Sequence, residues 1–345
     1  MVIEICPLER SKESAWDAYV HRSPEAGPYH LQGWRRVIEQ SYGHRGFYLW
    51  ALENGETKGI LPLILIQSRL LGRSFVSLPF VDEGGICAED PQTREKLFRE
   101  ALRLFEDRKA DCLDLRHRRP SGLDIPSHGS KVTLVLPLAD DPERLWQSFD
   151  AKLRNQIRKA TRSGLTASWN GAEGLADFYK IFAIHMRDLG SPVHSRGFFE
   201  AILNEFPNDA RLILIHKEGR VIGGGVCLLF KDTLYIPWAS SLSEYFSVCP
   251  NNLLYWEAIR WGCEKGYKRF DFGRSSPGGG TYRFKKQWGA LEEPLQWQCV
   301  NRNKNGTPTV DSDDFKYRWA SRIWKRIPVP ITRWIGPVLR RQIAN

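Results

Sequence analysis

The segment from Arg269 to Gly289 concentrates the residue types that bind anions and stabilise developing negative charge. An apolar strand pattern at its start runs into a glycine-rich loop that ends at Gly280, and aromatic residues then alternate with bases. The polar side chains of interest are Arg274, Tyr282, Arg283, Lys285 and Lys286. Ligands bind at strand ends in open α/β sheets, so we predict a substrate site here rather than an ordinary charged surface hairpin.

The glycine loop does not have the sequence of a nucleotide-binding loop. No Gly-Lys-Ser/Thr follows Gly278–Gly280, and we expect no helix to open there. If residues 284–286 form a strand, alternation places Phe284 and Lys286 on one face and Lys285 on the other. Phe284 is most naturally buried. Either Lys285 then points into a groove opposite the core, or Lys286 lies beside Phe284 along the rim of that groove.

Two carboxylates follow an earlier apolar strand pattern. The run Ser77–Val81 delivers Asp82 and Glu83 to a pair of glycines, which makes this loop a counterpart of the later one. A carboxylate at such a strand end can position or deprotonate an amine. It can equally cap the next element, and the residues alone leave both interpretations open.

A basic helix is predicted between the two loops, from Asp150 to Gly164. Arg154, Arg158 and Arg162 lie at i, i+4 and i+8, so on a helix they form one ridge. Such a ridge either contacts phosphates or is simply a solvated face. We treat Arg154 and Arg158 as candidate anion contacts.

These candidate residues are carried by a unit that occurs twice along the chain. A hairpin pattern at 47–66, with its turn at Asn54-Gly55, recurs at 211–230 with a turn at Glu218-Gly219. A third strand and a helical stretch follow each hairpin, at 92–108 and at 252–264. Strands containing Asp114 and Asp271 come next, and each half then has a late strand, at 132–136 and at 295–300. The sequence predicts two α/β units, each with a mixed sheet.

Composition narrows the class of protein. The longest apolar run, Gly59–Ile66, is too short to span a bilayer, and the N-terminus lacks the bases of a signal peptide. Seven cysteines without a Cys-x-x-Cys pair and scattered histidines predict neither a disulfide framework nor a metal site. We therefore expect a cytoplasmic protein, and the net charge of +10 favours an anionic partner.

The C-terminal segment from Lys316 is basic and rich in tryptophan. It has eight Lys or Arg and no acid, with Trp319, Trp324 and Trp334 among them, and three prolines interrupt it. We expect the tryptophans to pack on the body while the bases remain in water. Peripheral contact with the inner face of a membrane is the alternative.

The repeated unit resembles the GCN5-related N-acyltransferase (GNAT) fold. The tandem arrangement, the linking Arg154-Asn-Gln-Ile-Arg-Lys-Ala and the Phe284-Lys-Lys-Gln-Trp-Gly289 motif resemble the FemAB family of non-ribosomal peptidyl transferases. The Trp324-Lys-Arg-Ile-Pro tail is more similar to a FemAB-related branch associated with exosortase/PEP-CTERM exopolysaccharide systems. The resemblance covers nearly the whole chain, although the long coiled-coil arm of some Fem proteins has no room here.

The resemblance implies a transferase that moves an activated acyl or aminoacyl group onto an amine of a cell-envelope or exopolysaccharide-related precursor. It implies that Lys285 stabilises the reacting carbonyl and that Asp82 is the acidic loop residue. The donor is then an aminoacyl-tRNA or an acyl-CoA, and the acceptor is a phosphate-bearing envelope precursor. No bound cofactor or metal is expected.

Two alternatives to this transferase function are left open. The first alternative is an acyl-CoA-dependent N-acyltransferase, although residues 81–86 and 240–250 lack the pyrophosphate-binding pattern and contain acids. The second is a non-catalytic anion- or membrane-binding protein of an export system. The expected segments are a first unit (1–150), a basic linking helix (151–165), a second unit (166–310) and the C-terminal tail (311–345).

Overall fold

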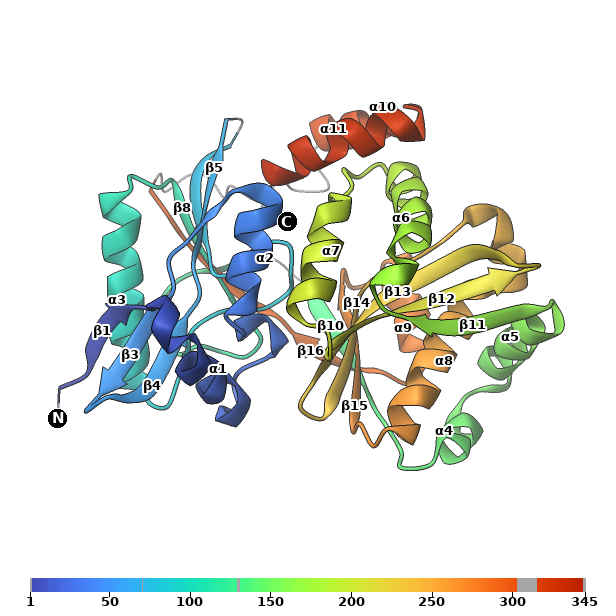
Figure 1. Ribbon diagram of the computed structural model, residues 1–345, viewed down its shortest axis with the longest axis horizontal. Helices are drawn as coiled ribbons and strands as arrows, with labels where there is room; N and C mark the ends of the chain where they lie inside the picture. The colour runs from blue at the N-terminus through green and yellow to red at the C-terminus, as the bar shows by residue number, and fades with distance from the viewer. Residues whose placement is uncertain (1, 70, 129–130, 303–314, 344–345) are drawn as a thin grey trace. The chain divides into compact units, whose positions relative to one another are not determined.

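The computed structural model describes residues 2–69, 71–128, 131–302 and 315–343 (Figure 1). The chain forms two compact units, and neither is one continuous stretch of sequence. The first comprises residues 1–130, 294–311 and 338–345, and the second comprises residues 131–293 and 312–337. The N-terminal segment of the first unit therefore ends at residue 130 rather than 150. The basic helix α5 (Ala151–Arg162) belongs to the second unit, and its Leu153, Ile157 and Ala160 are buried in the core of that unit.

The described residues of the first unit form two sheets and three complete α-helices. One sheet has the order β1 (Glu4–Pro7), β3 (Leu49–Glu53), β4 (Glu56–Leu61) and β7 (Cys87–Ala88). The other has the order β2 (Arg45–Gly46), β5 (Ile64–Ser68), β6 (Gly72–Val76), β8 (Cys112–His117), β17 (Gln296–Asn301) and β9 (Ser127–His128). The helices are α1 (Glu13–Arg22), α2 (Gly33–Tyr42) and α3 (Pro91–Asp107). The apolar face of α3 packs on both sheets through Leu97, Ala101 and Phe105.

The second unit is built on a single mixed sheet. Its order is β11 (Leu165–Asn170), β12 (Ala210–Lys217), β13 (Arg220–Phe230), β14 (Thr233–Ser241), β15 (Arg269–Ser275), β10 (Val132–Pro137) and β16 (Leu291–Pro294). The helices along this part of the chain, besides α5, are α4 (Pro142–Ser148), α6 (Leu175–Leu189), α7 (Arg196–Glu205), α8 (Pro250–Glu264), α9 (Gly280–Lys286), α10 (Phe315–Trp324) and α11 (Val329–Arg341).

Helices cover both faces of this sheet (Figure 1). Leu214 and Gly224 face Phe178 of α6, whereas Ile213 and Ile215 join the core formed with α5 and α8. The alternation of apolar residues along β12 therefore supplies two apolar layers, as expected for a central strand.

Both predicted hairpins are present, and their turns have the backbone conformation that the sequence indicated. Asn54 and Gly55 have φ of 51° and 83°, and Glu218 and Gly219 have φ of 51° and 73°. Two consecutive positive φ angles are characteristic of the type I′ turn, which matches the twist of a hairpin. The strands around them are β3 and β4 in the first unit and β12 and β13 in the second.

Each late strand pairs with a strand of the other unit, not with the unit that it follows in the sequence. The strand at 132–136 follows the first unit in sequence, but β10 pairs with β15 of the second unit, with Leu136 opposite Phe270. The strand at 295–300 follows the second unit, but β17 pairs with β8 of the first, with Gln296 opposite His117. The prediction of a late strand for each half holds only after this exchange. Apolar patterning identified both strands but carries no information about their partners.

Candidate active site

Two neighbouring strands of the second unit stop pairing part of the way along their length. The parallel pairing of β14 with β15 ends at Tyr235 and Asp271, although the strands continue to Ser241 and Ser275. We call residues 236–241 and 272–275 the strand fork. In the strand fork, backbone N–H and C=O groups of β15 that do not bond to β14 can instead bond to a side chain or a ligand.

A bulge in β15 turns two carbonyl groups toward one side chain. The pairing with β10 shifts register between Thr133 and Val135, and Gly273 has a φ of 71° that favours glycine. Asp271 holds the bulge because its Oδ1 accepts hydrogen bonds from Gly273 N and Thr133 Oγ1, each at 2.7 Å. The carbonyls of Gly273 and Arg274 then both accept from Lys285.

Lys285 is buried at the fork. Its Nζ lies 2.8 Å from the Gly273 carbonyl and 2.9 Å from the Arg274 carbonyl, and the residue is 4% exposed. An ammonium group is strongly hydrated in water, so burial against backbone carbonyls gives it a defined position. The structure thus brings Lys285 next to the backbone of Arg274.

The local conformation around Lys285 differs from the prediction. Residues 280–286 form helix α9, so the strand alternation expected for residues 284–286 is wrong, and a helix does open at the glycine loop. Three glycines weaken a helix signal in the sequence, but Phe284 packs against Tyr255 with ring centroids 5.4 Å apart and anchors the turn. The rejection of a nucleotide-binding loop therefore depends only on the missing Gly-Lys-Ser/Thr.

The other polar residues of α9 lie nearer the surface. Lys286 is exposed and its Nζ is 3.3 Å from Glu292 Oε1, while the Arg283 guanidinium donates to the Gly278 carbonyl at 3.1 Å. The Tyr282 hydroxyl donates to Glu292, and this bond lowers the pKa of that carboxyl. Of the bases on this helix, Lys285 is the buried one.

Helix α5 forms as predicted and reaches the start of α8. Gln156 Oε1 accepts from Asn252 Nδ2 at 3.1 Å, which ties the two helices together. Arg158 is exposed and stacks on Trp146 at 5.4 Å, which is how a surface base packs. Arg154 is half-buried, and within the described part of the chain its Nε has no hydrogen-bond partner.

Two buried hydroxyls at the fork were not singled out by sequence reasoning. Ser240 Oγ and Ser275 Oγ are buried without a hydrogen-bond partner among the described residues. A native interior rarely leaves hydroxyls unpaired, and such groups commonly mark a missing ligand or water. Serine is a common residue, so the sequence alone does not show which serines are buried without a hydrogen-bond partner.

Asp82 lies in the first unit, in a loop that is held by Arg116. The Arg116 guanidinium donates to the Val81 carbonyl at 3.0 Å, and the Arg116 carbonyl accepts from Gly84 N and Gly85 N at 3.0 and 2.8 Å. Trp297, from strand β17, donates its indole N–H to the Asp82 carbonyl at 2.9 Å. The loop is therefore fixed through its backbone, and Asp82 itself is half-buried.

Arg116 belongs to a buried charge network. Its Nε is 3.1 Å from Asp114 Oδ2, its guanidinium lies 4.5 Å from the Trp297 ring, and His128 Nε2 is 2.9 Å from Asp114 Oδ1. Burial by itself raises the pKa of Asp114, but Arg116 and His128 outweigh it and hold that pKa below its ordinary value. Asp114 is thus a carboxylate paired with a fully buried arginine.

The repeat predicted from the sequence aligns Asp114 with Asp271, and the residues two positions later differ. In the second unit that residue is Gly273, beside Lys285, whereas in the first unit it is Arg116, whose side chain bonds across to Leu78 and Val81. Pairing of β6 with β8 ends at Val76 and Asp114, where β6 itself ends, while β8 continues to His117. In the first unit, Arg116 therefore links the segment after β6 to β8, whereas in the second unit Lys285 binds carbonyls of β15 itself.

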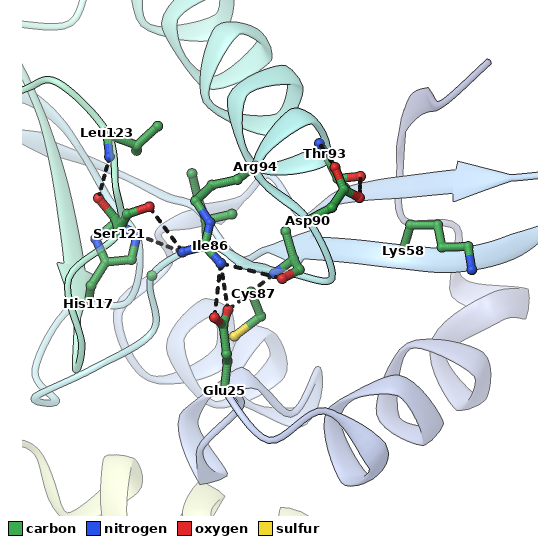
Figure 2. Close-up of polar contacts among 12 residues, drawn as sticks. Glu25, Lys58, Ile86, Cys87, Asp90, Thr93, Arg94, His117, Ser121 and Leu123 are labelled. Atoms are coloured by element: carbon green, nitrogen blue, oxygen red, sulfur yellow. Dashed lines mark hydrogen bonds and ion pairs between the residues drawn. The ribbon is translucent and has the colours of Figure 1, made fainter. Parts of the chain in front are cut away.

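The segment that follows the acidic loop is also anchored (Figure 2). Ile86 N donates to His117 Nε2 at 3.1 Å, and Arg94 binds both oxygens of Glu25 at 3.0 and 2.8 Å. Arg94 also donates to the Ser121 carbonyl at 3.1 Å. Burial lowers the pKa of His117 to about 3, so its imidazole is neutral and can accept from Ile86.

The described residues offer no metal site and no membrane span. They contain no cluster of three His, Cys, Asp or Glu side chains arranged to hold a metal ion. Within the same residues, no helix combines the length and apolar character needed to cross a bilayer.

Comparisons with known proteins agree with this architecture. Residues 147–286 match the family model described as an acetyltransferase (GNAT) domain. A lipid II:glycine glycyltransferase of Staphylococcus haemolyticus is 19% identical over 376 residues, covering 79% of this chain and 87% of that protein. The crystal structure of FemX superposes with a TM-score of 0.70 at 16% identity, covering 87% of this chain and 98% of that chain.

A tandem GNAT protein from the clavulanic acid biosynthesis pathway supports the two-unit architecture. It superposes with a TM-score of 0.56 at 11% identity and covers 88% of this chain and all of its own. The predicted mixed α/β fold with two GNAT-like units is confirmed. The chain is an acyl- or aminoacyltransferase that contains a GNAT domain, is built from two GNAT-like units and is similar to FemAB proteins.

Proposed function

We propose that this enzyme transfers an aminoacyl group from aminoacyl-tRNA to an amine of a phosphate-bearing cell-envelope precursor. The observation that carries the proposal is the buried Lys285 ammonium, held by two carbonyls at the strand fork of the GNAT-matched segment. The similarity to a lipid II:glycine glycyltransferase supports a lipid-linked cell-wall precursor as the acceptor. An exopolysaccharide-related precursor is the alternative acceptor.

The reaction needs little chemistry beyond positioning and charge stabilisation. The acceptor amine attacks the ester carbonyl carbon of the donor, and a C–N bond and an oxyanion form. The ester C–O bond then breaks, the tRNA hydroxyl leaves with a proton, and the amine loses one. A cation fixed beside the carbonyl stabilises the oxyanion without having to reorganise. We assign this role to Lys285.

Asp82 remains our candidate for the carboxylate that orients the amine and accepts its proton. Its support is the rigid loop: Trp297 and Arg116 hold the backbone on either side, so the carboxylate has a defined position without being buried. A carboxylate in a defined position can orient an amine and accept its proton.

Phosphates of the donor or acceptor have several candidate contacts in the second unit. Arg154 is the best supported because its buried Nε has no hydrogen-bond partner in the described chain, and such a group gains from binding an anion. We propose Arg158 and Arg274 as further phosphate contacts. Tyr282, Arg283 and Lys286, which lie nearer the surface on α9, are proposed as substrate contacts at the edge of the site.

Acyl-CoA is the second donor, and the GNAT match is the observation that favours it. The connection between β14 and α8 argues against it. A 3₁₀ helix at Ser243–Val248 with Glu244 in its first turn occupies the place where an ordinary GNAT protein presents backbone amides to pyrophosphate. An acid there repels phosphate.

The assay pairs the full-length chain with radiolabelled aminoacyl-tRNA or acyl-CoA and with lipid II or an exopolysaccharide precursor. We expect transfer from aminoacyl-tRNA to lipid II. Lys285→Ala should lower kcat by about 10²–10³, the usual effect of losing one oxyanion donor, and Lys286→Ala should be mild. Equal activity of Lys285→Ala and the unmodified enzyme at matched thermal stability would remove Lys285 from the mechanism. Transfer from acyl-CoA alone would favour the second donor, and ligand binding without transfer would favour the non-catalytic alternative.

A further inference from the structure

Among their described residues, the C-terminal helices α10 and α11 bury mainly small side chains and expose several large apolar ones. The inward residues include Ser321, Thr332 and Gly336, together with the large side chain of Trp324. A side chain at Gly190 would meet Ser321, and one at Gly336 would meet Val193, so this inner face lies directly against the end of α6. The two helices are therefore docked on the second unit.

The outer face carries the apolar residues that a solvent-facing helix normally avoids. Trp319 is 60% exposed and Trp334 is 80% exposed. Ile323 and Ile331 are also exposed. On each helix these residues lie on the side opposite the buried ones, as the helical spacing requires. The expectation that the tryptophans pack on the body therefore holds for Trp324 alone among Trp319, Trp324 and Trp334.

Bases surround this outer face. Residues 315–345 contain eight Lys or Arg and no Asp or Glu. Arg322 on α10 and Arg333 on α11 are exposed, as are Lys325 and Arg326 in the turn between the helices. Tryptophan prefers the boundary between lipid headgroups and acyl chains, while arginine and lysine bind anionic headgroups. A protein partner with an apolar patch would not require a continuous set of bases without acids.

A cavity beside Trp334 gives this surface a place for a phosphate. It measures about 450 Å³ and is lined by Arg196, Arg333 and Trp334 among other residues. The Arg333 guanidinium is positioned by stacking on the Tyr179 ring at 5.4 Å. Two guanidinium groups next to an exposed indole match a phospholipid, which has an anionic phosphate beside its acyl chains.

We propose that the outer face of α10 and α11, defined by Trp319, Ile323, Ile331 and Trp334, binds the surface of an anionic phospholipid bilayer. The cavity between Arg196 and Arg333 receives a headgroup phosphate. The helices lie on the membrane through their indole and isoleucine side chains and do not cross it. This surface is distinct from the strand fork, and its role does not depend on the proposed reaction.

The test is co-sedimentation of the full-length chain with vesicles of phosphatidylcholine alone or mixed with phosphatidylglycerol, without substrate. We expect binding to the anionic vesicles that weakens with salt. The double variant Trp319→Ser/Trp334→Ser should lower the partition coefficient at least about tenfold, since both indoles leave the interface. Phe246→Ser is the matched control because it removes an exposed aromatic residue of the same unit, and it should bind like the unmodified chain.

A second pair of variants tests the phosphate cavity. Arg196→Gln/Arg333→Gln should reduce the salt dependence of vesicle binding while the tryptophan surface remains. Equal sedimentation of the unmodified chain and the tryptophan variant would overturn the proposal, as would equal binding to neutral and anionic vesicles. Light scattering that shows a dimer lost in the tryptophan variant, without vesicle binding, would assign the face to a second copy of the chain and also overturn it.

Discussion

Replacing Arg116 by leucine should destabilise the first unit far more than the loss of any exposed base. The side chain is fully buried, pairs with Asp114 at 3.1 Å, donates to the Val81 carbonyl at 3.0 Å and stacks on Trp297. Removing one partner of a buried ion pair leaves the other charge uncompensated, which costs about 3–5 kcal/mol. We expect a loss of unfolding free energy in this range, measured by urea unfolding with tryptophan fluorescence.

The same variant should loosen the acidic loop before the unit unfolds. The amides of Gly84 and Gly85 donate to the Arg116 carbonyl, so hydrogen exchange in the peptide that contains residues 77–88 should quicken. Arg103→Leu is the matched control because its guanidinium pairs with Glu100 and Asp107 on the surface of α3, and it should leave the unfolding midpoint unchanged.

A double variant separates charge from packing. Arg116→Leu/Asp114→Leu removes both charges, so it should be no less stable than Arg116→Leu alone. The reasoning would be refuted if Arg116→Leu lay within about 1 kcal/mol of the unmodified chain, or if the second substitution added its own full loss, since independent sites add.

Two further predictions concern the anion ridge and acid stability. Arg154→Ala/Arg158→Ala should weaken binding of a phosphate-bearing donor and flatten the dependence of log K on log salt, because fewer ion contacts remain; an unchanged slope in filter binding with aminoacyl-tRNA would return both residues to a solvated face. His117 has a folded-state pKa near 3 against 6.5 ordinarily, so below about pH 6.5 the unfolded chain takes up a proton that the native chain refuses, and stability should fall as the pH drops toward 3. His117→Gln should lose less stability over that interval in urea-unfolding series, and an equally steep loss would contradict the assignment.

The sequence predicted those parts of the fold that local chemistry determines. The turns at Asn54-Gly55 and Glu218-Gly219, the strands holding Asp114 and Asp271, and helix α5 all lie where residue patterns placed them. Each of these depends on neighbours within a few residues. Lys285 was identified from a motif resemblance, while its burial on two carbonyls became visible only with the bulge at Gly273.

The failures share a dependence on contacts between distant segments. Strands β10 and β17 were found but attributed to the wrong units, because alternation does not specify a partner. Helix α9 was not predicted because the three glycines at its start have a low helix propensity. The helix is stabilised by the packing of Phe284 on Tyr255. The buried role of Arg116 could not be inferred because an arginine in a sequence is normally expected at the surface.

The exchange of β10 and β17 affects how the protein is made. Cys112 on β8 and Cys299 on β17 are 187 residues apart in sequence, so the ribosome must add that many residues before the first sheet can be completed. At elongation rates of about 5–20 residues per second this is a delay of roughly 10 to 40 s. During this delay the edge of β8 that will bond to β17 is unpaired, and unpaired strand edges can bond to other chains. Cutting the gene between the two sequence halves would therefore yield two fragments that each lack a strand of their own sheet.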